Sequence, residues 1–353
     1  MRRFIYLFLF FLFICGLILK AECEAAAKPY YEGKTIEILV GSRVGGGTDT
    51  MARIISNLMP KYIPGKPNMV IRVMPGASGS IANNIFWEKG KPDGLHLLMN
   101  SDSQVGLQMR GRDIVKYNLL DYKQIGNVSR GGNVLLIRKD ALGRLNNPKA
   151  EPLVCGTKEG EETWMGMVLL GKEILGWNVR WVPGYSGTSD MELGLQRGEV
   201  DMLGTSNSFV IDRLKKEGLA IPITQTGTYK QGKFMRRTDY ADVPTFVETL
   251  GEKKPSRIAW QSYLTFVGPN LLNKFLSAPP KTSQEYVSIL VGAFDKMSGD
   301  PIFDKMVKKM VSDVYDVNVG AETTAILKEV LDVPQEALDY GIRLQKKFGI
   351  IAK

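Results

Sequence analysis

The sequence predicts an α/β protein with two lobes, each a mainly parallel sheet flanked by helices. Two observations lead to this fold class. Short apolar runs alternate with helical runs over residues 36–224, and this alternation is typical of βαβ units with parallel strands. The chain of 353 residues is also long enough to form two separate hydrophobic cores.

The first 27 residues predict a secretory signal peptide, which is not part of the fold. Arg2 and Arg3 precede the sixteen uncharged residues 4–19, and small residues follow up to Ala27. A basic start, an apolar run and a small-residue cleavage site together indicate export and cleavage near Ala27. A retained membrane anchor and a lipid anchor at Cys23 are the alternatives.

Composition argues against several function classes. Cleavage after residue 27 would leave a net charge of +8, where the whole chain has +9. No basic helix is interleaved with aromatic residues, so we expect no nucleic-acid partner. Cys155 would be the one remaining cysteine, which excludes an intrachain disulfide and favours a buried position. With His96 as the single histidine and no paired cysteines, we expect no metal, no cofactor and no catalysis.

The first strand–loop–helix unit is the most informative element. Residues 36–40 read as a buried strand, 41–49 as a glycine-rich loop and 51–58 as an amphipathic helix. The unpaired N–H groups at a helix start favour an anion, and we expect Thr48 or Asp49 to cap this helix. A turn that binds nothing is the alternative. The glycine spacing does not fit a dinucleotide fingerprint, and the lysine of a P-loop is absent.

A second unit of the same kind follows about thirty residues later. Residues 69–74 predict a strand, 75–80 a loop and 81–87 the start of a helix. Because loops that follow parallel strands meet at one edge of a sheet, both helix starts should lie together. This arrangement is suited to a carboxylate or a phosphate.

Further elements follow in order along the chain. Residues 95–100 predict a strand that ends at Ser101, and the strands 125–128 and 134–138 flank a crossover. Three more strand–helix units are expected at 153–155 with 164–175, 179–182 with 190–196, and 200–203 with 209–216. A strand at 219–224 is followed by helices at 286–297, 301–311 and 321–331, where apolar residues recur at helical spacing.

Several motifs in this order resemble one family. They are Gly45-Gly46-Gly47-Thr48-Asp49 with Ala52-Arg53, Pro75-Gly76-Ala77-Ser78-Gly79, Pro92-Asp93-Gly94, Val182-Pro183 with Gly187, Gly198 with Val200-Asp201, and Asp242-Val243-Pro244-Thr245. The chain resembles the Bug-type periplasmic substrate-binding proteins of tripartite tricarboxylate transporters. The resemblance implies a type II periplasmic binding protein fold. Lobe one would comprise residues 28–128 plus 256–353, and lobe two residues 129–255.

The resemblance also implies a function. Such a protein captures a small carboxylate between its lobes in the periplasm and delivers it to membrane permease subunits, and we expect a monomer. A ligand sensor for a signalling receptor and an exported enzyme are the alternatives. The candidate ligand-binding residues are Arg43, Val44, Gly45, Gly46, Gly47, Thr48, Asp49, Gly76, Ala77, Ser78, Gly79, Ser80, Ser101, Glu162, Thr163, Tyr185, Ser186, Gly187, Ser206 and Asn207.

Three departures from the family pattern put the ligand's identity in doubt. Arg43 stands where the family has small or apolar residues, and it could bind a carboxylate or point into solvent. Glu161 and Glu162 place acids on the lobe-two side of the expected cleft. The loop around Tyr185 is one residue longer than in the family and lacks its lysine. A ligand with one carboxylate and a neutral, aromatic or amino end therefore fits as well as a di- or tricarboxylate.

Overall fold

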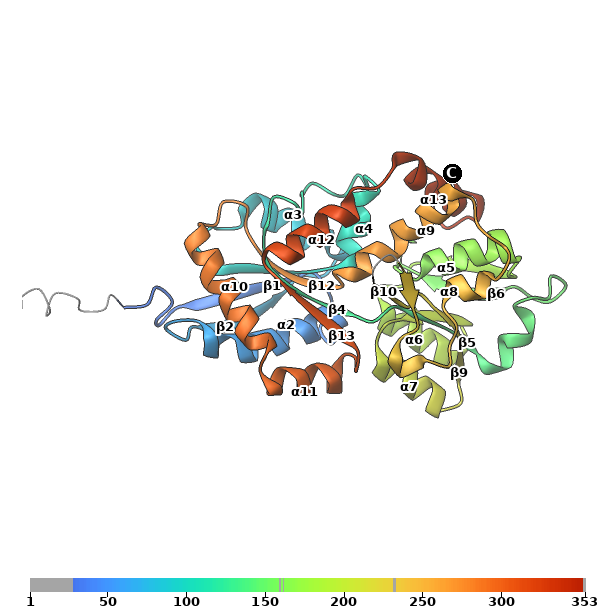
Figure 1. Cartoon of the computed structure of the whole chain (residues 1–353), viewed down its shortest axis with the longest axis horizontal. Coiled ribbons are helices and arrows are strands. Elements are labelled where there is room, and N and C mark those ends of the chain that lie inside the picture. The colour runs from blue at the N-terminus through green and yellow to red at the C-terminus, as the bar shows by residue number, and fades with distance from the viewer. Residues whose placement is uncertain (1–27, 159, 161, 231–232, 352–353) are drawn as a thin grey trace, which may run out of the picture.

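The computed structural model describes residues 28–158, 160, 162–230 and 233–351, which form two lobes side by side (Figure 1). The predicted signal peptide, the alternative anchor at Cys23 and the acid Glu161 lie outside the described residues. Within the described residues, every helix is too short or too polar to span a bilayer.

Lobe one is built on a mixed sheet, which has six strands among the described residues. In spatial order these are β13 (Tyr315–Val319), β4 (Lys123–Arg130), β12 (Lys274–Ala278), β3 (His96–Ser101), β1 (Thr35–Val40) and β2 (Asn68–Val73). Strand β1 pairs in parallel with β2 and β3, whereas β12 is antiparallel to β3 and β4, and β13 is antiparallel to β4.

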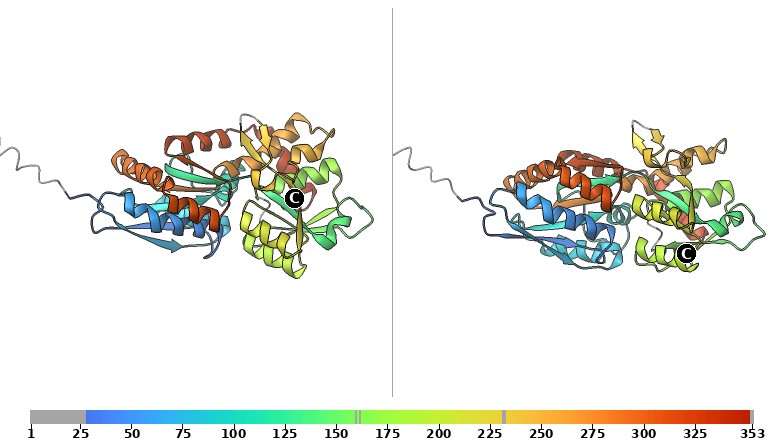
Figure 2. Two further views of the ribbon diagram at one scale, coloured as in Figure 1. Left: turned by 60° about the horizontal axis from the view of Figure 1, so that its bottom comes forward. Right: turned by 90° about the horizontal axis from the view of Figure 1, so that it is seen from below.

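Helices cover both faces of this sheet (Figure 2). Alternate residues of β1 point to opposite faces, so Ile36 and Ile38 join one core and Leu39 joins the other. The first core is covered by α2 (Gly47–Leu58), α10 (Gln284–Ser298) and α11 (Pro301–Met310). The second is covered by α3 (Ser80–Lys89), α4 (Asp102–Met109) and α12 (Ala321–Leu331).

Lobe two has its own mixed sheet and a single core. In spatial order its strands are β7 (Val179–Pro183), β6 (Leu153–Thr157), β8 (Met202–Thr205), β5 (Val134–Arg138) and β9 (Ala220–Gln225). Strand β6 is parallel to β7 and β8, and β5 is antiparallel to β8 and β9. The helices packed on it include α5 (Met165–Leu170), α6 (Thr188–Arg197), α7 (Ser208–Lys216) and α8 (Phe246–Leu250), and a hairpin of β10 (Thr228–Lys230) and β11 (Lys233–Met235) follows β9.

The C-terminal part of the chain is shared between the lobes. Helix α9 (Arg257–Val267) packs on α5, and α13 (Gln335–Lys347) packs on α9 at the lobe-two end of the molecule (Figure 1). Tyr263, Phe266 and Leu344 accordingly belong to the lobe-two core. Strands β12 and β13 with α10 to α12 belong to lobe one. The described chain therefore passes between the lobes three times, and the lobe boundaries at residues 128 and 255 stay a prediction.

The predicted two-lobed α/β fold is confirmed, and the strand–helix units through residue 225 lie where the sequence indicates. Both sheets are mixed rather than mainly parallel, because β12 and β13 in lobe one and β5 in lobe two run antiparallel to their neighbours. Cys155 is buried, and burial raises the pKa of its thiol well above the usual value.

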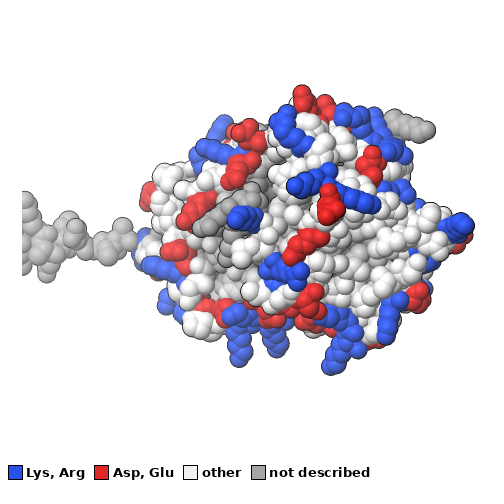
Figure 3. Space-filling view, turned by 45° about the vertical axis from the view of Figure 1, so that its right-hand side comes forward, with Lys and Arg blue, Asp and Glu red and all other residues white. Residues whose placement is uncertain are grey.

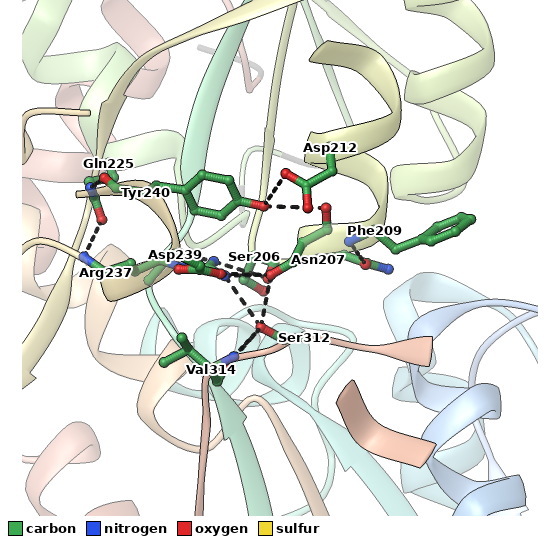
Figure 4. Close-up of polar contacts among 12 residues, drawn as sticks. Ser206, Asn207, Phe209, Asp212, Gln225, Arg237, Asp239, Tyr240, Ser312 and Val314 are labelled. Atoms are coloured by element: carbon green, nitrogen blue, oxygen red, sulfur yellow. Dashed lines mark hydrogen bonds and ion pairs between the residues drawn. The ribbon is translucent and has the colours of Figure 1, made fainter. Parts of the chain in front are cut away.

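Buried Arg237 joins the parts that meet between the lobes (Figure 4). Its guanidinium donates to the carbonyl oxygens of Gly132 at 2.9 Å and Ser206 at 3.1 Å. It also donates to the Asp239 carboxylate at 2.6 and 2.9 Å, and to the Ser312 hydroxyl of lobe one at 3.3 Å. Because this side chain is fully buried, these partners together satisfy a charge that water cannot reach.

Gly132 is a point of close approach in the first crossing. A Cβ atom there would overlap the carbonyl oxygen of Gly227, and the N–H of Thr226 donates to the carbonyl oxygen of Asn133 at 2.8 Å. We predict that Gly132→Ala lowers the free energy of unfolding by about 1–3 kcal/mol, because an added methyl group must push two backbones apart. Urea denaturation measures this, with Gly143→Ala as control, since a Cβ at Gly143 meets no atom within 4 Å. Equal effects of the two substitutions would contradict the prediction.

Candidate functional site

A cavity of about 710 Å³ lies between the lobes. Lobe one contributes the loops after β1, β2 and β3, and lobe two contributes the loops after β6, β7 and β8. This is the edge at which open α/β sheets bind ligands, because the carboxyl ends of the parallel strands meet there. The volume is suited to a small organic molecule.

The first loop presents a helix start to the cavity. Helix α2 begins at Gly47 with Gly46 as its N-cap, and no side chain caps it. The expected cap at Thr48 or Asp49 is therefore wrong. The first-turn N–H groups, including those of Gly47 and Thr48, have no partner one turn earlier in the helix and are available to an anion. Asp49 instead accepts from the Gly45 N–H at 2.8 Å and pairs with Arg53.

The second loop holds an unusual backbone. Ala77 and Ser78 have φ angles of 44° and 50°, and Gly79 follows at 91°. Left-handed geometry in residues with a Cβ costs about 1–3 kcal/mol each and recurs at binding sites. The Gln104 side chain fixes this loop, since its amide donates to the Ser78 carbonyl while its oxygen accepts from the Ser101 N–H at 2.6 Å.

Two cations from lobe one line the cavity between these loops. Lys274 begins β12 and is buried, with Nζ 3.5 Å from an Asp102 carboxylate oxygen and 3.1 Å from the Asn273 carbonyl oxygen. Arg130 ends β4 and donates from Nε to the Asn273 side-chain oxygen at 2.9 Å. A Cβ on Gly47 would lie 3.5 Å from the Arg130 guanidinium, so this cation lies beside the helix start.

Burial changes the proton affinity of both cations. Desolvation lowers the pKa of Lys274 to about 8, opposed by nearby Asp102, while Arg130 and Lys158 lower it further. Desolvation likewise lowers the pKa of Arg130 to about 10. Asp102 is the nearest carboxylate to both and cannot offset two positive charges. An anion in the cavity would remove this imbalance.

On the lobe-two side, the carboxylate of Glu162 lines the cavity but is already hydrogen-bonded within its own loop. Its carboxylate accepts from the Thr157 hydroxyl at 2.7 Å and from the Lys158 N–H at 2.6 Å. It thereby closes the loop after β6. The neighbouring Thr163 hydroxyl accepts from the Asn133 amide at 2.7 Å, so the first crossing is tied to this loop.

Two polar contacts bridge the cleft. Lys158 of lobe two donates from Nζ to the Ser103 hydroxyl of lobe one at 2.9 Å. Arg43 lies 3.5 Å from Asp190, and both are partly exposed. Of the two interpretations of Arg43, the structure shows a side chain that reaches across the mouth of the cleft. Both contacts join lobe one to lobe two across the cleft.

This chain has the fold of a periplasmic binding protein. A TctC solute-binding protein from Polaromonas is 18% identical with a TM-score of 0.60, covering 90% of this chain and 99% of its own. The periplasmic binding protein BugD is 19% identical with a TM-score of 0.65, covering 91% and 99%. A Rhodopseudomonas palustris protein solved with adipate is 18% identical with a TM-score of 0.66, covering 90% and 97%.

The likeness to these proteins is one of fold. No protein-family model matches the chain, and no curated protein matches it. The fold implied by the resemblance to Bug-type proteins is thus confirmed by solved structures that share about a fifth or less of its residues.

The structure brings most of the candidate ligand-binding residues to this one cavity. Those lining it are Arg43, Val44, Gly46, Gly47, Thr48, Gly76, Ala77, Ser78, Gly79, Ser101, Glu162, Thr163, Tyr185, Ser186, Gly187 and Ser206. The other four do not line it. Gly45 and Asp49 bond to each other, Ser80 is fully buried, and Asn207 caps α7 by accepting from the Phe209 N–H.

Apart from Arg43, sequence reasoning missed the cations of the cavity, and it missed the amide side chains. Three of these residues lie next to the end of a predicted strand, and that position could have indicated a place in the cavity: they are Arg130, Asn133 and Lys158. Lys274 and Asn273 gave no such signal, because β12 was not predicted and reaches the cleft from a distant part of the chain.

Proposed function

We propose that this protein is an extracytoplasmic solute-binding protein that captures a small carboxylate between its lobes. The observation that carries the proposal is the cavity in which a helix start adjoins two cations, the buried Lys274 and the half-buried Arg130. Both features favour a negative charge. Delivery to a membrane permease and a periplasmic location form part of the proposal, supported by the predicted signal peptide.

Basic and acidic side chains are interspersed over the face shown in Figure 3, so no large field of one sign dominates that face. Hydrogen bonds from a protein to a charged group contribute about 1.5–3 kcal/mol each. After association costs, a few such bonds are consistent with roughly micromolar affinity.

The ligand we favour carries a carboxylate at the helix starts and a second acidic or polar group toward Lys274. The engagement of Glu162 with Thr157 and Lys158 supports this, since it weakens the case for an amino group at the far end. Among structures of the same fold, one is solved with bound malate and another with adipate. Dicarboxylates are therefore the first compounds to test.

The test begins with native mass spectrometry of the purified mature protein, which reports any ligand retained from the cell. Calorimetry with malate, adipate and monocarboxylates of matched length follows. We expect dissociation constants in the micromolar range for at least one compound. Absence of carboxylate binding at millimolar concentration, together with turnover of a substrate, would refute the proposal.

A substitution in the second loop tests where the carboxylate lies. A Cβ on Gly79 would overlap the Gln104 amide, and the residue has a φ of 91°. We predict that Gly79→Ala weakens carboxylate binding at least about tenfold, because it displaces the loop that Gln104 holds. Gly176→Ala is the matched control: it also has a positive φ, but a Cβ there meets no atom within 4 Å. Unchanged affinity in a folded Gly79→Ala variant would remove this loop from the site.

Carboxylate affinity is predicted to depend on pH above neutrality. The Lys274 ammonium is fully protonated only below its pKa of about 8, and an anion binds the protonated form more tightly. Affinity should be constant from about pH 6 to 7 and fall by up to about tenfold per pH unit above pH 8, until the pKa of the complex is reached. Calorimetry over pH 6–10 checks this. A flat profile in that range would show that Lys274 does not contact the ligand.

A further inference from the structure

The two contacts that bridge the cleft differ in their charge balance. Arg43 of lobe one lies 3.5 Å from the Asp190 carboxylate of lobe two, so this bridge joins opposite charges. Lys158 of lobe two donates from Nζ to the Ser103 hydroxyl of lobe one at 2.9 Å. Among the described residues, this neutral hydroxyl is the one hydrogen-bond or ion-pair partner of the Lys158 ammonium. The second bridge therefore carries a positive charge across the cleft to a neutral partner.

The place that Lys158 reaches already holds a positive charge. Ser103 follows Asp102 in the first turn of α4, and the ammonium of the buried Lys274 lies 3.5 Å from the Asp102 carboxylate. Lys158 is close enough to lower the pKa of Lys274. The Asp102 carboxylate also accepts from the Asn273 amide at 3.1 Å and from the Ser103 N–H at 3.0 Å. It therefore offsets one of the two ammonium charges and leaves the other in excess.

This excess charge opposes closure of the cleft, and a ligand can reverse its effect. Lys158 lies in the loop after β6 of lobe two and Lys274 begins β12 of lobe one, so their ammonium groups approach each other as the lobes close. Like charges repel, and without a ligand this repulsion favours an open cleft. An acidic group between the two ammoniums accepts a charge-assisted hydrogen bond from each lobe and thereby joins the lobes.

We propose that Lys158 binds the second acidic group of the ligand, and that this contact drives closure of the lobes. This inference rests on the proposed function. The first carboxylate lies at the start of α2 beside Arg130, which adjoins Gly47, and the second acidic group lies between Lys274 and Lys158. A dianion then closes the cleft, whereas a monoanion of the same length binds to lobe one and leaves the lobes open. The protein thus distinguishes the two by its conformation, because only the dianion has a higher affinity for the closed state.

The test uses the full mature chain with adipate and monomethyl adipate, which has the same chain and one charge fewer. Calorimetry should show adipate binding at least about tenfold more tightly, the equivalent of one hydrogen bond to a charged group. Small-angle scattering at saturating ligand should give a smaller radius of gyration with adipate than with the ester. Malate and its monomethyl esters are a second matched pair. Equal radii of gyration with diacid and ester, or binding of monocarboxylates alone, would overturn the proposal.

Substitutions at position 158 separate the charge of the side chain from its packing. Lys158→Met should lower adipate affinity at least about tenfold, leave the affinity for the ester unchanged, and give equal radii of gyration with both compounds. Lys158→Arg should restore the difference between them. Lys149→Met is the control and should behave as the parent, because Lys149 is an exposed lysine of lobe two that does not line the cavity.

The outcomes distinguish this inference from the function on which it rests. If Lys158→Met binds adipate and closes as the parent does, Lys158 does not bind the second acidic group, although the carboxylate function stands. If no carboxylate binds to the parent, the monomethyl esters included, the proposed function fails and this inference fails with it.

Discussion

Replacing Lys274 by Met is expected to abolish most of the carboxylate affinity. The side chain is buried, projects an ammonium into the cleft and has one carboxylate neighbour, Asp102, at 3.5 Å. Removing one partner of a buried charge pair costs about 2–5 kcal/mol of binding free energy, which corresponds to a loss of at least about 30-fold. Calorimetry with the best carboxylate of the panel measures the change. The variant should also lose the pH dependence above pH 8.

The same substitution should not unfold the protein. Burial lowers the pKa of Lys274 in the folded chain, so the unfolded chain holds this proton more tightly between about pH 8 and the ordinary lysine pKa near 10.4. The folded state is thus disfavoured by the charge at neutral pH, and Lys274→Met should leave the free energy of unfolding equal or higher. Lys281→Met, exposed beyond the end of the same strand, is the control. A Lys274→Met variant that binds carboxylate as the parent does would refute the assigned role.

Replacing Arg237 by Met is expected to cause the largest loss of stability. The guanidinium is fully buried and bonds Asp239, two backbone carbonyls and the hydroxyls of Ser208 and Ser312. Its loss leaves the Asp239 carboxylate without its cationic partner at the junction of the lobes. Breaking a buried pair in this way costs about 3–5 kcal/mol, a large share of a typical stability of about 5–15 kcal/mol. Urea denaturation measures it.

The neighbouring arginine supplies a matched control. Arg236 pairs with Glu248, and both side chains are more than 40% exposed. Solvent screens such a pair, so Arg236→Met should cost less than about 1 kcal/mol. If the two adjacent substitutions destabilise the protein equally, the buried network around Arg237 does not hold the lobes together.

The strand–helix units and the first two loops could be predicted from sequence because their signals are local. An apolar run, a glycine-rich turn and an amphipathic helix lie within about twenty residues of one another, as in β1 and α2. The rule that such loops share one sheet edge then placed Gly46 and Ser78 at the same cavity. The ligand-binding roles of these residues stay a prediction.

The remaining features depend on contacts between distant parts of the chain. Strand β12 is a short run, Lys274–Ala278, whose partners β4 and β3 lie about 150 and about 175 residues earlier. A strand this short has too little hydrophobic periodicity to be predicted from the sequence around it. The engagement of Glu162 with Thr157, which turns its charge inward, is likewise set by the fold of one loop. Charge type can be read from sequence, but the direction of a side chain cannot.

The shared C-terminal segment has a consequence for folding. The lobe-one core needs Phe303 and Leu327, and the lobe-two core needs Leu344 and Ile350. Neither lobe is complete until nearly the whole chain has been synthesised. Contacts of such long sequence separation slow folding. Tertiary packing of both lobes is therefore completed only after the last helix is made, and such a delay would suit the export that the predicted signal peptide implies.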